Sequence, residues 1–163
     1  MTTRTVASYS FEEIEGVIDE TIKKFLEHDK QLLELCVDER ASTHRIACYL
    51  ENFFDNSWHV DCEYNRKGRD PKRQNGGLVR PDIIVHRRYT CDNLLCVEVK
   101  KCGEILANDR KKLREFTNNN GEYRYRFGLL LLISLEDPYS INGRWYRKGV
   151  VNTQWIEYPK KVD

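Results

Sequence analysis

The chain contains 163 residues, of which 40% are hydrophobic and 33% are charged. This length and composition predict a soluble, globular protein of one domain, residues 1–163, with a single hydrophobic core. The net charge of +1 excludes any inference of a nucleic-acid partner from overall charge. Such an inference has to rest on where the charges lie.

Membrane and disulfide signals are absent from the sequence. The first residues, MTTRTVASYSFEEIEG, contain no apolar core of signal-peptide length, and the apolar run 128–135 is too short to cross a bilayer. The six cysteines form no CxxC pair, and a chain of this size needs no disulfides. We therefore expect a reduced, cytoplasmic protein with no membrane partner and no zinc.

Helical patterns occupy the first third of the chain. Ser10 and Glu13 form a capping box, and the apolar spacing behind it predicts a helix to about Glu27. A short helical turn at 32–36 completes an N-terminal extension, residues 10–36. The next helix is expected from Asp38 to Phe54, with an apolar stripe of Ile46, Ala47, Leu50, Phe53 and Phe54.

Glu39 lies on that inward-facing stripe, seven residues before Ile46. A carboxylate there is unfavourable without a partner. Two explanations remain open, namely capping of the helix N-terminus and reach into an active site.

Three strands are predicted next. Trp58–Tyr64 alternates apolar and polar residues, whereas 81–89 and 93–101 read as two strands joined by a turn at 90–92. Between the first two strands, the glycines and prolines of Asn65–Gly77 predict a loop. This loop is strongly basic and contains Arg66, Lys67, Arg69, Lys72 and Arg73.

A further helix is expected over Glu104–Thr117, followed by a buried strand over Arg126–Leu135. One or two edge strands should follow within 144–158. The core, about 38–135, then has the order αβββαβ. This order predicts an α/β fold with a mixed central sheet flanked by helices, in which a hairpin precedes a parallel crossover.

Hairpin geometry gathers a set of charged side chains. With a turn centred near Cys91, Asp82 should lie opposite Lys100 or close to it, and Glu98 and Lys100 share one face of their strand. Two carboxylates suit Mg²⁺, which acidifies a bound water, and a nearby ammonium can orient that water. The alternative is a surface Asp82–Lys100 pair with Glu98 in solvent, but residues 94–99 read as a buried strand.

The segments Arg80-Pro81-Asp82-Ile83-Ile84-Val85 and Val97-Glu98-Val99-Lys100 resemble the PD-(D/E)xK, or restriction-endonuclease-like, nuclease superfamily. The size and motif also resemble Holliday-junction resolvases. The resemblance implies that Asp82 and Glu98 bind Mg²⁺ or Mn²⁺, with the Val99 carbonyl as a further ligand. It also implies that Lys100 assists the attacking water and that Glu39 joins the site.

The resemblance implies an endonuclease, with DNA favoured over RNA as the substrate. The loop residues Arg66, Lys67, Arg69, Lys72 and Arg73, and Arg80 beside the site, are the expected phosphate contacts. Cleavage of both strands of a duplex would favour a homodimer. The alternative is a catalytically silent module that binds nucleic acid or protein on the same fold. The roles of Asp109, which faces inward, and of Glu63 stay open.

Overall fold

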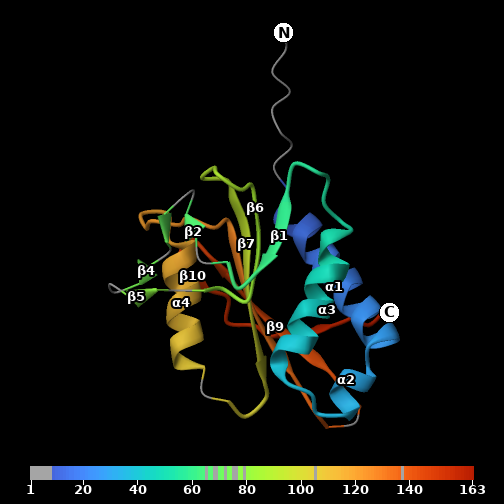
Figure 1. Cartoon of the computed structure of the whole chain (residues 1–163). Coiled ribbons are helices and arrows are strands. Elements are labelled where there is room, and N and C mark those ends of the chain that lie inside the picture. The colour runs from blue at the N-terminus through green and yellow to red at the C-terminus, as the bar shows by residue number, and fades with distance from the viewer. Residues whose placement is uncertain are drawn as a thin grey trace.

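A mixed seven-stranded sheet runs through the protein, with helices on both of its faces (Figure 1). The computed structural model describes residues 9–64, 80–104, 106–136 and 138–163, and the backbone of four two-residue strands between 66 and 78. The sheet order is β1-β6-β7-β8-β9-β10, and β11 also pairs with β9. These strands are β1 (His59–Cys62), β6 (Ile83–His86), β7 (Asn93–Lys101), β8 (Phe127–Ile133), β9 (Ile141–Arg147), β10 (Val150–Val151) and β11 (Ile156–Tyr158).

The described part of the chain contains helices α1 (Phe11–His28), α2 (Gln31–Glu34), α3 (Glu39–Glu51) and α4 (Ala107–Thr117). The predicted capping box is confirmed, because Ser10 Oγ accepts from the Glu13 amide (3.1 Å) and Glu13 accepts from the Ser10 amide (2.6 Å). It fixes the start of α1 by satisfying two of the amides that a helix N-terminus leaves unpaired.

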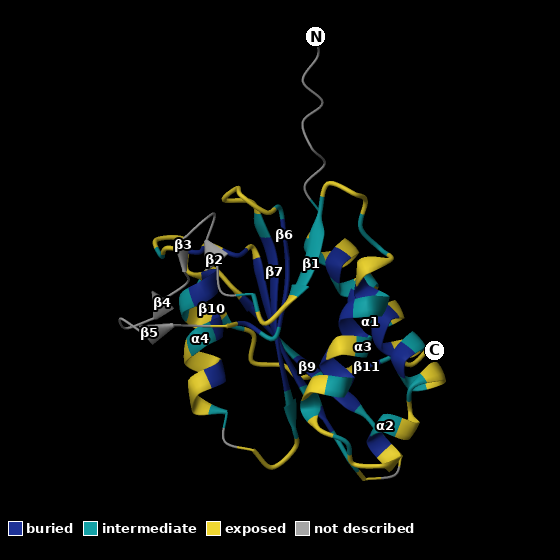
Figure 2. Ribbon diagram, viewed as in Figure 1, coloured by how far each residue is buried: buried dark blue, intermediate teal, exposed yellow. Residues whose placement is uncertain are grey.

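Two hydrophobic layers follow from the alternation of side chains along the strands. Ile83, Val85 and Val97 pack with α1 and α3, whereas Ile84 and Cys96 pack with α4. The buried stripe of each long helix therefore faces the sheet (Figure 2). No helix among the described residues has the length and apolarity that a membrane crossing requires.

The core order αβββαβ is confirmed. Strands β1, β6 and β7 pair in antiparallel fashion, and β7 pairs in parallel with β8 after the α4 crossover. Strand β7 lies between β6 and β8, and its residues 94–99 are all buried. Burial on both faces explains its nearly continuous apolar sequence.

The ends of several elements differ from the expectation. Helix α3 stops at Glu51 rather than Phe54, because the amides of Asn52 and Phe53 bond to the carbonyls three residues back and tighten the turn. Helix α4 begins at Ala107 rather than Glu104, and the residue before it, the N-cap Leu106, has φ −102° and ψ 1° and makes no side-chain capping bond.

The prediction of C-terminal edge strands from Arg144 was wrong in part. Strand β9 begins at Ile141 and is interior, with β8 on one side and β10 and β11 on the other. The apolar positions Ile141, Trp145 and Tyr146 are buried by this pairing. Of the C-terminal strands, β10 and β11 lie at the edge of the sheet, opposite β1.

The segment predicted as the loop 65–77 contains two short ladders. Strand β2 (Arg66–Lys67) pairs with β3 (Asp70–Pro71), and β4 (Arg73–Gln74) pairs with β5 (Gly77–Leu78). Both ladders lie on the α4 side of the molecule (Figure 1). The phosphate contacts predicted in this loop fall outside the described residues: for Arg69 and Lys72 this applies to the whole residue, and for Arg66, Lys67 and Arg73 to the side chain.

Candidate functional site

The register of the β6–β7 hairpin differs from the expected one by two residues. The ladder pairs Ile83 with Val97, and one further step along it places Asp82 opposite Glu98 rather than Lys100. The turn is centred nearer Thr90 than Cys91, and the register shifts again between Val85 and His86. The two carboxylates are therefore direct cross-strand neighbours on the face that carries Ile84 and Cys96.

Asp82 lies immediately before β6 begins, beside a part of β7 that continues past β6. Its Oδ2 accepts a hydrogen bond from the Val99 amide (2.8 Å), and its carbonyl accepts one from the Glu63 amide (3.1 Å). The side chain thus replaces the strand partner that Val99 lacks at this point. Since the N–H and C=O of one strand residue point to the same side, the Val99 carbonyl also faces the start of β6.

Glu98 is a buried carboxylate with an incomplete set of partners. Only 1% of the residue is exposed, and its Oε1 lies 2.9 Å from Lys112 Nζ. This contact is an ion pair by distance, but neither Glu98 oxygen receives a well-aligned hydrogen bond from the described residues. Burial raises the pKa of Glu98 well above its ordinary value, and the Asp82 charge adds to the rise, while Lys112 opposes it.

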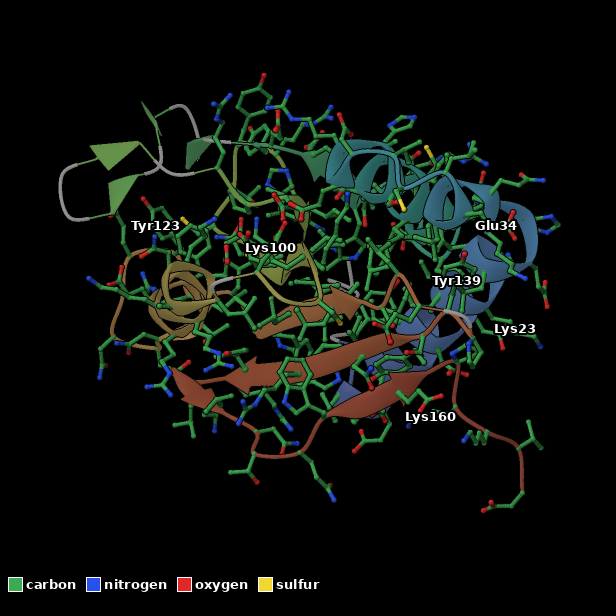
Figure 3. The ribbon with its side chains drawn as sticks, turned by 90° about the horizontal axis from the view of Figure 1, so that it is seen from below. Lys23, Glu34, Lys100, Tyr123, Tyr139 and Lys160 are labelled. Carbon is green, nitrogen blue, oxygen red and sulfur yellow. The ribbon has the colours of Figure 1, made fainter. Side chains whose placement is uncertain are left out.

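Lys100 connects the end of β7 to the start of α3. Its Nζ lies 3.1 Å from Glu39 Oε1, and about a quarter of each side chain is exposed. Asp38, not Glu39, caps the helix, because its side chain accepts from the Ala41 amide. Of the two explanations for Glu39, the structure thus contradicts capping. Figure 3 shows Lys100 between α3 and α4.

The charges of Glu39, Lys100 and Asp109 influence one another's pKa values. Burial raises the pKa of Glu39, although Lys100 partly offsets this. Burial lowers the pKa of Lys100, but the hydrogen bond with Glu39 and the nearby Asp109 carboxylate outweigh it, and the pKa is raised. Lys100 therefore stays an ammonium group at neutral pH.

Helix α4 adds two residues, Asp109 and Lys112, that face Glu98. Asp109 is buried, and burial raises its pKa, with Lys100 and Lys112 opposing. The inward orientation predicted for Asp109 is confirmed, but Lys112 pairs with Glu98 rather than with Asp109. Lys112 was missed as a site residue; the available signal was its position one helical turn after Asp109, on a helix that packs over β7.

A pocket of about 360 Å³ opens beside the carboxylates, on the α3 side. Glu39, Thr43, Cys62, Glu63 and Asp82 contribute to its lining. Glu63 pairs with Arg40 of α3 at 3.7 Å, rather than across a strand. The pocket therefore gives a path from solvent to the Asp82 side of the site. Arg80, two residues before Asp82, is exposed.

The carboxylate and carbonyl oxygens of the site suit a hard cation that keeps part of its hydration shell better than a soft cation. Among the described residues no three His, Cys, Asp or Glu side chains converge on one point in the manner of a complete metal site. Mg²⁺ does not need such a set, because it commonly uses one or two carboxylates and keeps several waters. Asp82, Glu98 and the Val99 carbonyl would hold it, and the two Glu98 oxygens lacking well-aligned hydrogen bonds fit that role.

Comparison with protein-family models, with curated proteins and with solved structures found no match of any kind.

Proposed function

We propose that the protein is a divalent-metal-dependent endonuclease that hydrolyses phosphodiester bonds in DNA. The observation that carries this proposal is Glu98, a carboxylate 1% exposed, without a well-aligned hydrogen bond and across from the Asp82 carboxylate. Two like charges in such a place are unfavourable unless a cation joins them. Mg²⁺ or Mn²⁺ supplies that charge.

The arrangement of the chain supports a restriction-endonuclease-like core. Asp82 precedes the second strand of an αβββαβ unit, and Glu98 and Lys100 lie near the end of the third. This is the placement implied by the resemblance of Pro81-Asp82 and Glu98-Val99-Lys100 to the PD-(D/E)xK pattern. The register of the two strands places Asp82 opposite Glu98, so the closeness of the two carboxylates does not depend on long, flexible side chains.

Each polar group then has a role in hydrolysis. A bound Mg²⁺ lowers the pKa of water and stabilises charge on the phosphorane-like transition state. Asp82 and Glu98 would hold this ion, and the hydrogen bond from the Val99 amide orients Asp82. Lys100, kept charged by Glu39, orients the attacking water or offsets the developing negative charge. We expect the phosphodiester to enter by the pocket beside Asp82.

A silent binding module on the same fold is the second candidate, and one observation favours it. The Lys112 ammonium already neutralises Glu98 at 2.9 Å, so the protein can fold without metal. If that ion pair is permanent, Asp82 and Glu98 would not bind a cation. Metal binding therefore separates the two functions.

The experiment is a cleavage assay on duplex, branched and single-stranded DNA and on RNA, with Mg²⁺, Mn²⁺ or EDTA. Wild type should cut DNA only with a metal, and Asp82→Asn and Glu98→Gln should each remove cleavage. Glu51→Gln is the matched control, since Glu51 is exposed at the end of α3. Undiminished cutting by a purified, folded Asp82→Asn/Glu98→Gln variant would overturn the assignment.

A further inference from the structure

Charge is divided unequally along the chain. Residues 9–64, which include α1, α2 and α3, carry 14 acidic and 5 basic side chains. Residues 80–163, which include α4, carry 16 basic and 11 acidic side chains. The helices of the two groups cover opposite faces (Figure 1). The net charge of +1 thus conceals an acidic N-terminal part and a basic C-terminal part.

Four basic side chains gather where α4 meets β9. We call this the α4–β9 surface and define it as Arg110 and Arg114 of α4, Arg144 of β9 and Lys148 of the β9–β10 turn. Helix α4 packs against β9, and Arg144, Arg110 and Arg114 all act on the pKa of Tyr146 in β9: burial raises this pKa, the three arginines oppose the rise, and Asp109 adds to it. The Gly149 amide donates to Thr117 Oγ1 (3.2 Å), which brings the β9–β10 turn against the end of α4.

These side chains are not neutralised within the described part of the protein. None of the four forms an ion pair with a described carboxylate, whereas Arg45, Arg87, Arg88 and Lys160 elsewhere all do. Arg110, Arg114 and Lys148 are exposed. The guanidinium of Arg144 lies 5.4 Å from the ring centre of Trp155, which is itself 36% exposed. Unpaired arginines beside an exposed aromatic ring are typical of nucleic-acid-binding surfaces.

The surface and the candidate site share helix α4. Successive residues of a helix are about 100° apart, so Lys112 and Asp109 face Glu98 while Arg110 and Arg114 face β9. A helix with its side chains is only about 10–12 Å across. A strand of nucleic acid that crosses α4 can therefore touch both.

We infer that the α4–β9 surface binds the phosphate backbone of DNA and delivers it across α4 to the Asp82–Glu98 site. This inference rests on the proposed function for the identity of the polymer. The binding itself does not require cleavage.

The test measures binding without chemistry. Anisotropy of a short labelled DNA duplex is recorded in EDTA at several NaCl concentrations, with wild type and with Arg110→Gln/Arg114→Gln/Lys148→Gln. The triple variant avoids Arg144, whose Nε donates to the Asn152 carbonyl (2.9 Å) and helps hold the fold. Lys23→Gln/Lys30→Gln/Lys161→Gln removes the same charge from exposed positions elsewhere and is the control.

Wild type should bind DNA with an affinity that falls as salt rises. The surface variant should bind more weakly, and its slope of log affinity against log salt should be smaller by about 3, because each lost phosphate contact lowers the slope by roughly 0.9. The control should match wild type. An equal slope for the surface variant and wild type, or a wild type that does not bind DNA, overturns the inference. Binding without any metal-dependent cleavage would overturn the nuclease proposal alone.

Discussion

The ammonium group of Lys112 on α4 lies 2.9 Å from Glu98 Oε1 on β7, and this pair joins the helix to the central strand beneath it. Glu98 is 1% exposed and the Lys112 side chain 18% exposed, so water does little to stabilise either charge. The pair places an ammonium group against a buried carboxyl group at the place where we propose that a metal binds.

Removal of Lys112 should show how far the stability of the protein depends on this pair. Lys112→Met should lower the free energy of unfolding by about 3 kcal/mol in EDTA at about pH 8, because it leaves an uncompensated buried charge. The loss should be smaller at low pH, where Glu98 is protonated. Urea melts measure it. The neighbouring, exposed Lys111→Met is the control and should be nearly neutral; an equally small effect at Lys112 would mean that Glu98 is protonated throughout.

The raised pKa of Glu98 predicts a pH dependence of stability in the metal-free protein. The folded state keeps this proton at pH values where the unfolded chain has released it. The stability it contributes is therefore full below the ordinary glutamate pKa of about 4.3 and is lost as pH rises through the folded value. Glu98→Gln should remove this loss, up to about 1.4 kcal/mol per pH unit, whereas Glu51→Gln should keep the wild-type profile. Urea-induced unfolding of wild type and both variants, measured across the pH range, distinguishes the two profiles.

Metal should stabilise the folded protein by mass action. At a hundredfold excess over its dissociation constant, Mn²⁺ or Mg²⁺ should add about 2.7 kcal/mol to wild type and less to Asp82→Asn. Without metal, Asp82→Asn should be at least as stable as wild type, because an amide oxygen can still accept from the Val99 amide and one of two facing charges is gone. Thermal melts with EDTA and Mn²⁺ test both statements. A destabilised variant beside a metal-insensitive wild type would assign Asp82 a structural role.

Variants of Lys100 and Glu39 should distinguish effects on cleavage from effects on stability. Their pair is about one-quarter exposed, so Glu39→Gln should lower stability by about 1 kcal/mol at most. Lys100→Met should reduce cleavage about a hundredfold or more, because an ammonium that assists the water is lost. Single-turnover cleavage and melts are compared for each variant. Full activity in a folded Lys100→Met would leave the role of Lys100 limited to its contact with α3.

Local sequence patterns determined most of the secondary structure. The capping box at Ser10 and the 3.6-residue period behind it depend only on neighbours along the chain, and they place α1 almost to the residue. The apolar run of β7 and the hairpin before it also follow from local alternation. The same patterns identified Asp82, Glu98 and Lys100 as residues on adjacent strands.

Tertiary structure decided which of these residues meet. A shift of the turn by one position changes the partner across a hairpin by two residues, so Asp82 faces Glu98 and Lys100 reaches Glu39. The register is set by how Ile83, Val85 and Val97 pack beneath α1 and α3, which no local pattern records. The rotation of α4 over the sheet likewise sends Lys112 to Glu98 and leaves Arg110 and Arg114 beside β9, because helix packing is fixed by the whole interface.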